Sequence, residues 1–473
     1  MMGFYELMTY LEPRARRINA QQAESLYASL PRVVRWGLKN LYPYIAPPSV
    51  IAERGFRAPP GMYFDNSLAA ARLRSLALRQ IERLWEAKRQ GCKIIGLAQD
   101  AGQLLPFFLA GKKLAWFSFD TLGALYAATS RERTAFQAAE QAGVRRESCP
   151  VIKACVGLLH TGRIPTPDLI VAQTGSSCDD HAVQMQLKAW LGYPVYWLEL
   201  PYRRSWQPYF SDEKAYAKDN RDCQRHARVF YQAQLRNLQS RLEEICGAKY
   251  TAEDLQGALR KINRFRQTLR RLFHRISVAK FCPWPAVDQL LLHVAAMDGY
   301  GDFEETQAIA DYLERVIAHR ERRGMGVLPG ELPSTPHILW MLPVLDMNLP
   351  GVLENAGARV TGWEMPHLAA YDYDTNMAPL AAMSTDYLRF TLLGDCRLRL
   401  KWLADFLARY RVDGIIYSAL WSCTQMPLQA GIVKDFLRNY NIPMLILDCG
   451  SPGELGSGQM RTRIEAFAEN LRG

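Results

Sequence analysis

Three cysteines lie where a metal-binding or reactive thiol is favoured. Cys149 precedes a proline in a short helix predicted to end at Gly162, since proline suits the first helical position and glycine the residue after the last. Cys178 follows the apolar, β-branched run 169–174, a predicted buried strand, and precedes a second predicted helix. A thiol at a helix N-terminus has its thiolate favoured by the helix dipole, and the thiolate is the form that binds metal.

The third cysteine, Cys423, has the same setting near the C-terminus. Residues 415–420 are predicted to form a strand and residues 425–439 a helix, with Cys423 in the turn between them. In open parallel sheets, ligands collect outside the carboxyl ends of the strands. The sequence therefore predicts that three thiols from two α/β halves converge on one cleft.

Several motifs accompany these cysteines in a fixed order. They are a cysteine that begins a helix ending in GRIPTPDLIV, a Cys-Asp pair after that strand, then YPVYWLELPY, ENAGARVTGWE, VDGIIYSALWSC and SGQMRTRIEAF. From about Lys93 to its end, the chain resembles the 2-hydroxyacyl-CoA dehydratase and benzoyl-CoA reductase family, in particular its iron-sulfur D-component type. It departs from that family at Pro150, where members usually have serine. The segment DCGSPGELGSGQ stands where members commonly have an Asp-Pro-Arg motif. Residues 105–107 stand where they have an early Pro-Glu motif.

The resemblance implies a 4Fe-4S cluster held by Cys149, Cys178 and Cys423. It further implies single-electron chemistry on a CoA thioester, in which a ketyl radical precedes the loss of water from a 2-hydroxyacyl group or the reduction of an aromatic ring. An ATP-hydrolysing activator protein would supply the electron, and a homologous partner subunit would complete the enzyme. The chain has no G-x-x-x-x-G-K-[ST] loop, so ATP hydrolysis would belong to the activator. No catalytic side chain is assigned.

Two other functions remain open from the sequence. One is a non-catalytic electron-transfer or scaffolding iron-sulfur subunit, in which Cys155 or Cys449 closes the fourth position on the cluster. The other is a reductase of small molecules with a larger double-cubane cluster, which would use the same two extra thiols. Cys396, at the start of a predicted helix, stays open, and four cysteines are expected to be structural: Cys92, Cys223, Cys246 and Cys282.

Other polar residues near the three cysteines have both an ordinary and a functional interpretation. Ser422 is a candidate hydrogen-bond donor to a cluster sulfur. His160 is expected to be an ordinary surface or core histidine rather than a group that transfers protons. Arg461 and Arg463 follow a Gly-Ser loop that could meet a phosphate, although packing of the helix that they begin is the favoured interpretation.

The composition is that of a globular, cytoplasmic protein. No run of about 18 apolar residues could span a bilayer, and ten cysteines in a cytoplasmic chain favour metal binding over disulfides. Arginine-rich stretches at 260–275 and 319–323 contribute to the net charge of +11. They predict a solvated helical face, or else contact with CoA phosphates or an acidic partner, while no nucleic-acid-binding signature is present.

Alternation of strand and helix indicates an α/β fold with two Rossmann-like or flavodoxin-like parallel-sheet domains and a helical insert between them. We expect an N-terminal helical extension at 1–90 and a first α/β domain at 91–205 that carries Cys149 and Cys178. A helical domain at 206–330 would have one hard break at 282–285. A second α/β domain at 331–473 would carry Cys423.

Overall fold

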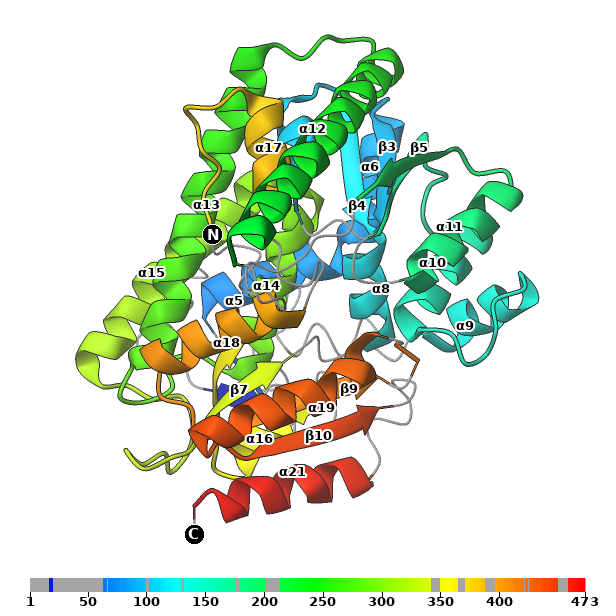
Figure 1. The fold of residues 1–473 in the computed structure, drawn as a ribbon. Helices are drawn as coiled ribbons and strands as arrows, with labels where there is room; N and C mark the ends of the chain where they lie inside the picture. Colours follow the sequence, from blue (N-terminus) through cyan, green and yellow to red (C-terminus); the bar gives the residue numbers. More distant parts are fainter. Residues whose placement is uncertain are drawn as a thin grey trace.

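The computed structural model describes most of the chain beyond residue 66. The described residues are 17–19, 63–65, 67–98, 102–128, 132–175, 179–200, 213–341, 349–364, 371–387, 396–420, 422–423, 425–449 and 458–472. They confirm an α/β fold with two four-stranded parallel sheets. In Figure 1 the two sheets lie toward opposite ends of the molecule, and helix α14 (Ala286–Asp298) lies between them.

The first sheet has the strand order β4-β3-β5-β6. Its members are β3 (Lys93–Ala98), β4 (Leu114–Ser118), β5 (Leu169–Thr174) and β6 (Val195–Glu199). The second sheet has the order β10-β9-β7-β8, with β7 (His337–Met341), β8 (Arg359–Trp363), β9 (Gly414–Leu420) and β10 (Met444–Cys449). Numbered within each half, both orders are 2-1-3-4, the flavodoxin-like order. Each half therefore has its topological switch point between its first and third strands.

Helices cover both sheets and fill the region between them. Around the first sheet they are α6 (Gln80–Arg89), α7 (Leu105–Ala110), α8 (Phe119–Ala128), α9 (Glu132–Gln141), α10 (Pro150–His160) and α11 (Asp179–Trp190). The middle of the chain adds α12 (Glu213–Cys246), α13 (Ala252–Val278), α14 and α15 (Phe303–Arg323). Helix α5 (Leu68–Leu78) packs against α14 and α15, and α17 (Pro379–Tyr387) packs against α12 and α13. The second sheet is accompanied by α16 (Leu349–Asn355), α18 (Cys396–Arg409), α19 (Gln425–Leu437) and α21 (Gly458–Asn470). None of the described helices has the length and apolar character needed to cross a bilayer.

The helical region is interrupted three times, so the expectation of a single hard break at 282–285 was wrong. The additional interruptions follow α12 at Gly247 and α14 at Gly299, and both glycines have positive φ. After the first of them, Thr251 caps α13 through a capping box with Asp254, which satisfies backbone N–H groups at the start of that helix.

The arginine-rich stretch at 260–275 is largely used in ion pairs. On α13, Lys261, Arg264, Arg271 and Arg275 pair with Glu304, Asp311, Glu314 and Glu321 of α15. Two further arginines of α13 pair with Asp372 and Asp386. These contacts favour the structural interpretation of the stretch over a phosphate-binding one.

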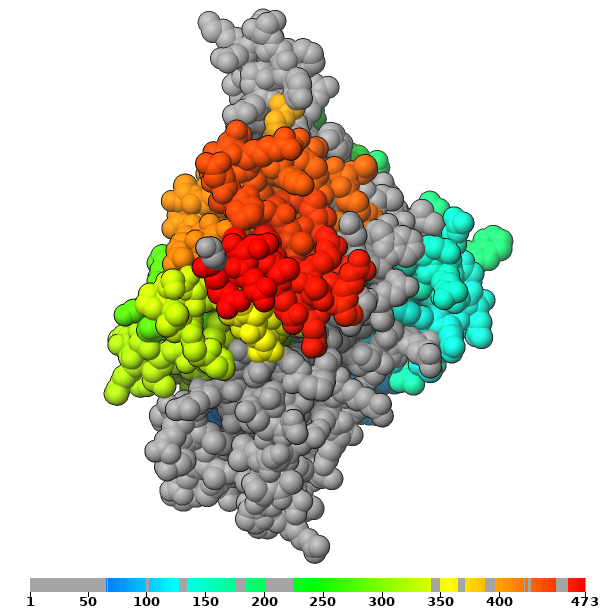
Figure 2. Space-filling view, turned by 90° about the horizontal axis from the view of Figure 1, so that it is seen from below, coloured from blue at the N-terminus to red at the C-terminus, as the bar shows by residue number. Residues whose placement is uncertain are grey.

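Each face of the second sheet has its own hydrophobic core. Ile338, Trp340 and Ile416 belong to one core, which also includes residues of α16 and α21. Leu339, Ile415 and Tyr417 belong to the other core, together with residues of α18 and α19. Figure 2 shows α21 (red) at the surface, beside the orange segment that contains α18 and α19.

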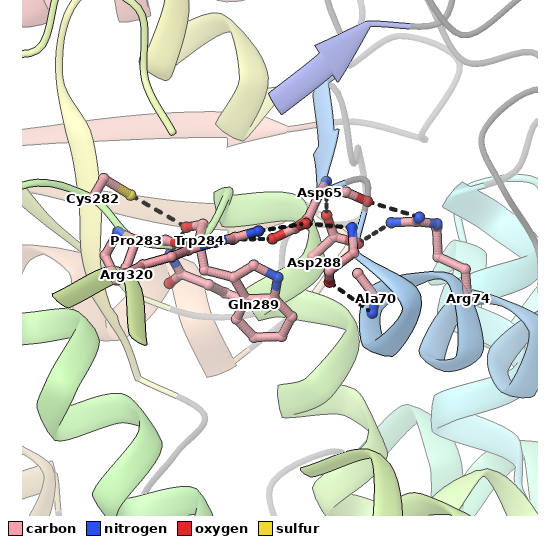
Figure 3. A network of polar contacts seen from close by, with 10 residues as sticks. Asp65, Ala70, Arg74, Cys282, Pro283, Trp284, Asp288, Gln289 and Arg320 are labelled. Atoms are coloured by element: carbon pink, nitrogen blue, oxygen red, sulfur yellow. Dashed lines mark hydrogen bonds and ion pairs between the residues drawn. The ribbon is translucent and has the colours of Figure 1, made fainter. Parts of the chain in front are cut away.

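Two short strands in the N-terminal part were not predicted. β1 (Arg17–Asn19) and β2 (Tyr63–Asp65) form an antiparallel pair. The pair is joined to the helical region by Asp65, whose backbone N–H donates to Asp288 of α14 at 2.6 Å. Figure 3 shows the buried network around these two aspartates.

Candidate functional site

Cys149 lies at the N-cap of α10, as the sequence predicted. Its φ of −49° and ψ of 128° are non-helical, while its carbonyl accepts the backbone N–H of Lys153 at 3.0 Å, as an N-cap carbonyl does. Pro150 occupies the first helical position, and Gly162 follows the last turn with a φ of 65°. The Cys149 side chain is half-buried at the positive end of the helix dipole, where a thiolate is favoured.

Close packing fixes α10 against its neighbours. A Cβ at Gly157 would lie 1.8 Å from the carbonyl oxygen of Ala135 in α9. A Cβ at Gly123 in α8 would lie 2.5 Å from the carbonyl oxygen of Val151 and 2.6 Å from the sulfur of Cys155. Because neither site has room for a methyl group, α10 lies tightly between α8 and α9, and the position of Cys149 is well determined.

Cys423 lies in the turn between β9 and α19, again as predicted. Its backbone N–H donates to the carbonyl of Leu420 at 2.8 Å, which closes the turn directly after the strand. The side chain is half-buried and packs against the core on the α16 and α21 face of the second sheet. This position is at the carboxyl end of β9, the third strand of its half and one of the two strands at the switch point.

Helix α10 and Cys423 contact the same core on one face of the second sheet, whereas Cys149 itself packs against a separate core that includes Ala139 and Val144. Val151, two residues after Cys149, packs against the same core of the second sheet as Cys423, and so does Ala124 of α8. Cys178, which follows β5 as Cys423 follows β9, lies outside the described residues. Within the described part of the chain no three His, Cys, Asp or Glu side chains form a group that could hold a metal ion.

Ser422, beside Cys423, has a buried hydroxyl oxygen with no hydrogen-bond partner among the described residues. Leaving a polar group buried and unsatisfied costs roughly 1–3 kcal/mol, so such groups usually have a partner. A hydroxyl beside a candidate metal ligand is therefore available to donate to a group bound there.

The surplus thiols mostly have structural surroundings. Cys155 is 1% exposed and donates to the carbonyl of Phe119 at 2.7 Å, and burial raises the pKa of its thiol far above the usual range. Burial also raises the pKa of Cys282 to about 12, and its thiol donates to Trp284. Cys246 donates to backbone carbonyls at the end of α12. Cys155 is thus poorly suited to be a further ligand. Cys396 is the first residue of α18, whereas Cys149 lies one residue before α10.

Two of the remaining candidates have ordinary roles. His160 is exposed at the end of α10. Arg463 donates to the backbone carbonyl of Ile446 in β10 at 2.6 Å, so it packs α21 on the sheet. These observations favour the structural interpretation of both residues.

One buried charge near Cys423 was missed by the sequence analysis. Arg399 of α18 is 1% exposed and forms an ion pair with Glu364, the residue after β8. The signal for its burial is its spacing with Leu403 and Phe406, which places the arginine on the apolar stripe of the helix.

The comparisons with known proteins give the family of the chain. The family model described as 2-hydroxyglutaryl-CoA dehydratase, D-component, matches residues 116–471, a range that includes Cys149, Cys178 and Cys423. The chain is also similar to the Escherichia coli (strain K12) protein named "Putative dehydratase subunit YjiM". The two are 24% identical over 341 residues, which cover 69% of this chain and 81% of that protein.

Proposed function

Because this chain belongs to the 2-hydroxyglutaryl-CoA dehydratase D-component family, we propose that it is the iron-sulfur subunit of an ATP-activated 2-hydroxyacyl-CoA dehydratase. Membership bears out the resemblance seen in the sequence. The proposal adds a 4Fe-4S cluster held by Cys149, Cys178 and Cys423. It also adds a homologous partner subunit, an ATP-dependent activator as electron donor, a CoA thioester substrate and a cytoplasmic location.

The main support is that α10, which Cys149 precedes, and Cys423 pack against one core of the second sheet. Both thiols are half-buried at the ends of elements that pack against one core, although 274 positions separate them in the sequence. Thiolates are the soft ligands that iron-sulfur clusters require. The buried hydroxyl of Ser422, which has no partner within the described part of the chain, supports a bound group at this place, because it could donate to a cluster sulfur.

The chain's own residues would hold and shield such a group. When bound, the cluster would supply one-electron chemistry, which protein side chains do not provide. The dipole of α10 would favour the thiolate form of Cys149, and the close packing at Gly157 would hold that helix in place. Three thiolate ligands would leave one iron open for a substrate or a small ligand.

Dehydration is the favoured reaction among the family's activities. The matched family and the similar protein both carry the word dehydratase in their descriptions. Ring reduction of an aromatic acyl-CoA, of the benzoyl-CoA reductase type, is the alternative for the same site. A double-cubane reductase would differ from the proposed dehydratase in its iron count. A non-catalytic electron-transfer subunit would differ from it in having no activity of its own.

The first test measures iron and acid-labile sulfide per chain, with electron paramagnetic resonance, on protein purified without oxygen. We expect about four irons per chain and a reducible cubane signal, the content of one 4Fe-4S cluster. About eight irons would instead indicate a double-cubane cluster. Absence of iron after anaerobic reconstitution would contradict the proposed cofactor.

Replacement of single cysteines then tests the ligands. Cys149→Ser, Cys178→Ser and Cys423→Ser should each lose most of the iron, because a hydroxyl is a poor substitute for a soft thiolate. Cys92→Ser is the matched control, since Cys92 is another half-buried thiol but precedes β3, at the amino end of the first sheet. Full iron content and an unchanged spectrum in Cys423→Ser would show that the ligand assignment is wrong.

A further inference from the structure

A single buried guanidinium joins the two elements that flank the Cys423 turn. Nη1 of Arg399 donates to the hydroxyl of Tyr417 in β9 at 2.9 Å and to Oε1 of Gln429 in α19 at 2.6 Å. Tyr417 lies six residues before Cys423, and Gln429 lies six residues after it. One nitrogen atom of Arg399 therefore joins the middle of β9 to the first turns of α19, and Cys423 lies in the turn between these two elements.

The guanidinium itself is held rigidly. Its Nη2 donates to Oε2 of Glu364 at 2.7 Å, and its Nε donates to the other carboxylate oxygen of the same residue. The guanidinium also lies over the ring of Tyr417, with its central carbon 5.0 Å from the ring centroid. A bidentate, buried ion pair of this kind fixes the direction of the remaining nitrogen.

Tyr417, the partner of Arg399 in β9, and Cys423 pack on different faces of the second sheet. Tyr417 belongs to the core shared with α18 and α19, whereas Cys423 packs against the core on the opposite face. Arg399 donates to Glu364, Tyr417 and Gln429, so it acts through the strand and the helix that carry the turn.

We propose that Arg399, through Tyr417 and Gln429, is a positioning residue that holds the Cys423 turn in the geometry required for ligation. The part of this inference that concerns iron rests on the proposed function, whereas the part that concerns the turn does not. Removing either acceptor should loosen the turn, because β9 and α19 then lose their common hydrogen-bond donor. Arg399→Lys should not rescue the turn, since a single ammonium cannot reproduce the planar fork.

The test compares Tyr417→Phe, Gln429→Leu and Arg399→Lys with the wild type. Tyr300→Phe is the matched control, because Tyr300 is an equally buried tyrosine whose hydroxyl donates to Leu291 at 2.6 Å, outside this network. In the iron-free proteins, hydrogen exchange of the peptide around Cys423 should be about fivefold faster in the three test variants, the factor for one net hydrogen bond. The control should leave that peptide unchanged.

The reconstituted proteins provide the second measurement. The test variants should release iron to a chelator about fivefold faster than wild type, by the same factor, and their electron paramagnetic resonance spectra should be altered. A purely structural role would lower stability without changing the spectrum of the folded protein.

Exchange and iron release as slow as in wild type would overturn the inference. Wild-type protein that holds no iron would instead overturn the proposed function, while the exchange measurement would still decide whether Arg399 positions the turn.

Discussion

The hydroxyl of Ser422 should affect the midpoint potential of the proposed cluster. If it donates to a cluster sulfur, it stabilises the more negative, reduced state, and Ser422→Ala should make the midpoint potential more negative. We expect a shift of about 40 mV, which is roughly 1 kcal/mol for one electron. The potential is measured by redox titration followed by electron paramagnetic resonance.

A second serine of the same strand and turn serves as the control. Ser418 of β9 is buried, and its hydroxyl accepts from the indole of Trp340 at 2.9 Å. Ser418→Ala should leave the potential unchanged. A potential for Ser422→Ala equal to that of wild type would mean that this hydroxyl has no contact with the cluster.

The candidate site could be predicted from the sequence only in part. The helix signals around Cys149 and the strand before Cys423 are local, so both positions were predicted correctly. Cys155 was expected to be able to point to the region of Cys149, but six residues are about 1.7 turns of an α-helix, which places it about 120° away. Its thiol accordingly donates into the core of the first α/β half.

At the scale of elements, the position of Cys149 depends on how closely α10 packs against α9. Gly157→Ala would place a methyl group 1.8 Å from the carbonyl oxygen of Ala135. The gain in helix propensity of about 0.5–1 kcal/mol is smaller than the cost of overpacking, typically about 1–3 kcal/mol. We therefore expect a net loss of roughly 2 kcal/mol in the free energy of unfolding, measured by urea denaturation.

Gly431→Ala is the matched helical control. Gly431 lies within α19, and a Cβ there would meet nothing within 4 Å. It should stabilise the protein by about 0.5–1 kcal/mol, since the propensity gain is not opposed. If both glycine variants were equally stabilised, the close contact between α9 and α10 would not exist in solution.

Most elements of the fold followed from the sequence, for a physical reason. The strands at 169–174 and 415–420 were predicted as β5 and β9, because strands buried on both faces are continuous apolar runs. The interruptions at Gly247 and Gly299 were missed, because a single glycine is compatible with a helix as well as with its end. The shared 2-1-3-4 order of the two sheets has no local signal, since it depends on which strands pair.

At the scale of the whole molecule, a buried cluster of four charges joins distant parts of the chain (Figure 3). Arg320 of α15 pairs with Asp65 of β2, and Arg74 of α5 pairs with Asp288 of α14 at 2.6 Å. All four side chains are at most 2% exposed. The sequence analysis did not find them, because a charged residue on an amphipathic helix is normally expected on its solvent face.

The pKa values of the two aspartates of this cluster are shifted in opposite directions. Although burial opposes ionisation, the Arg320 guanidinium holds the pKa of Asp65 below its usual value. Burial raises the pKa of Asp288 to about 6 from 3.8, and the neighbouring negative charge of Asp65 adds to the effect of burial. Asp288 therefore takes up a proton in the folded protein at a pH where it is ionised in the unfolded chain.

This difference predicts how stability depends on pH. Between about pH 4 and pH 6 the folded state binds the proton of Asp288 more tightly, so the contribution of Asp288 to the free energy of unfolding falls as the pH rises through that window. The fall amounts to at most about 3 kcal/mol. In Asp288→Asn the amide cannot titrate, so urea denaturation across this range should show a correspondingly smaller fall than in wild type. Asp405→Asn, which removes an exposed carboxylate of α18, should keep the wild-type fall. Should Asp288→Asn also keep it, the proton would be taken up elsewhere, and the cluster would join β2 to the helices without sensing pH.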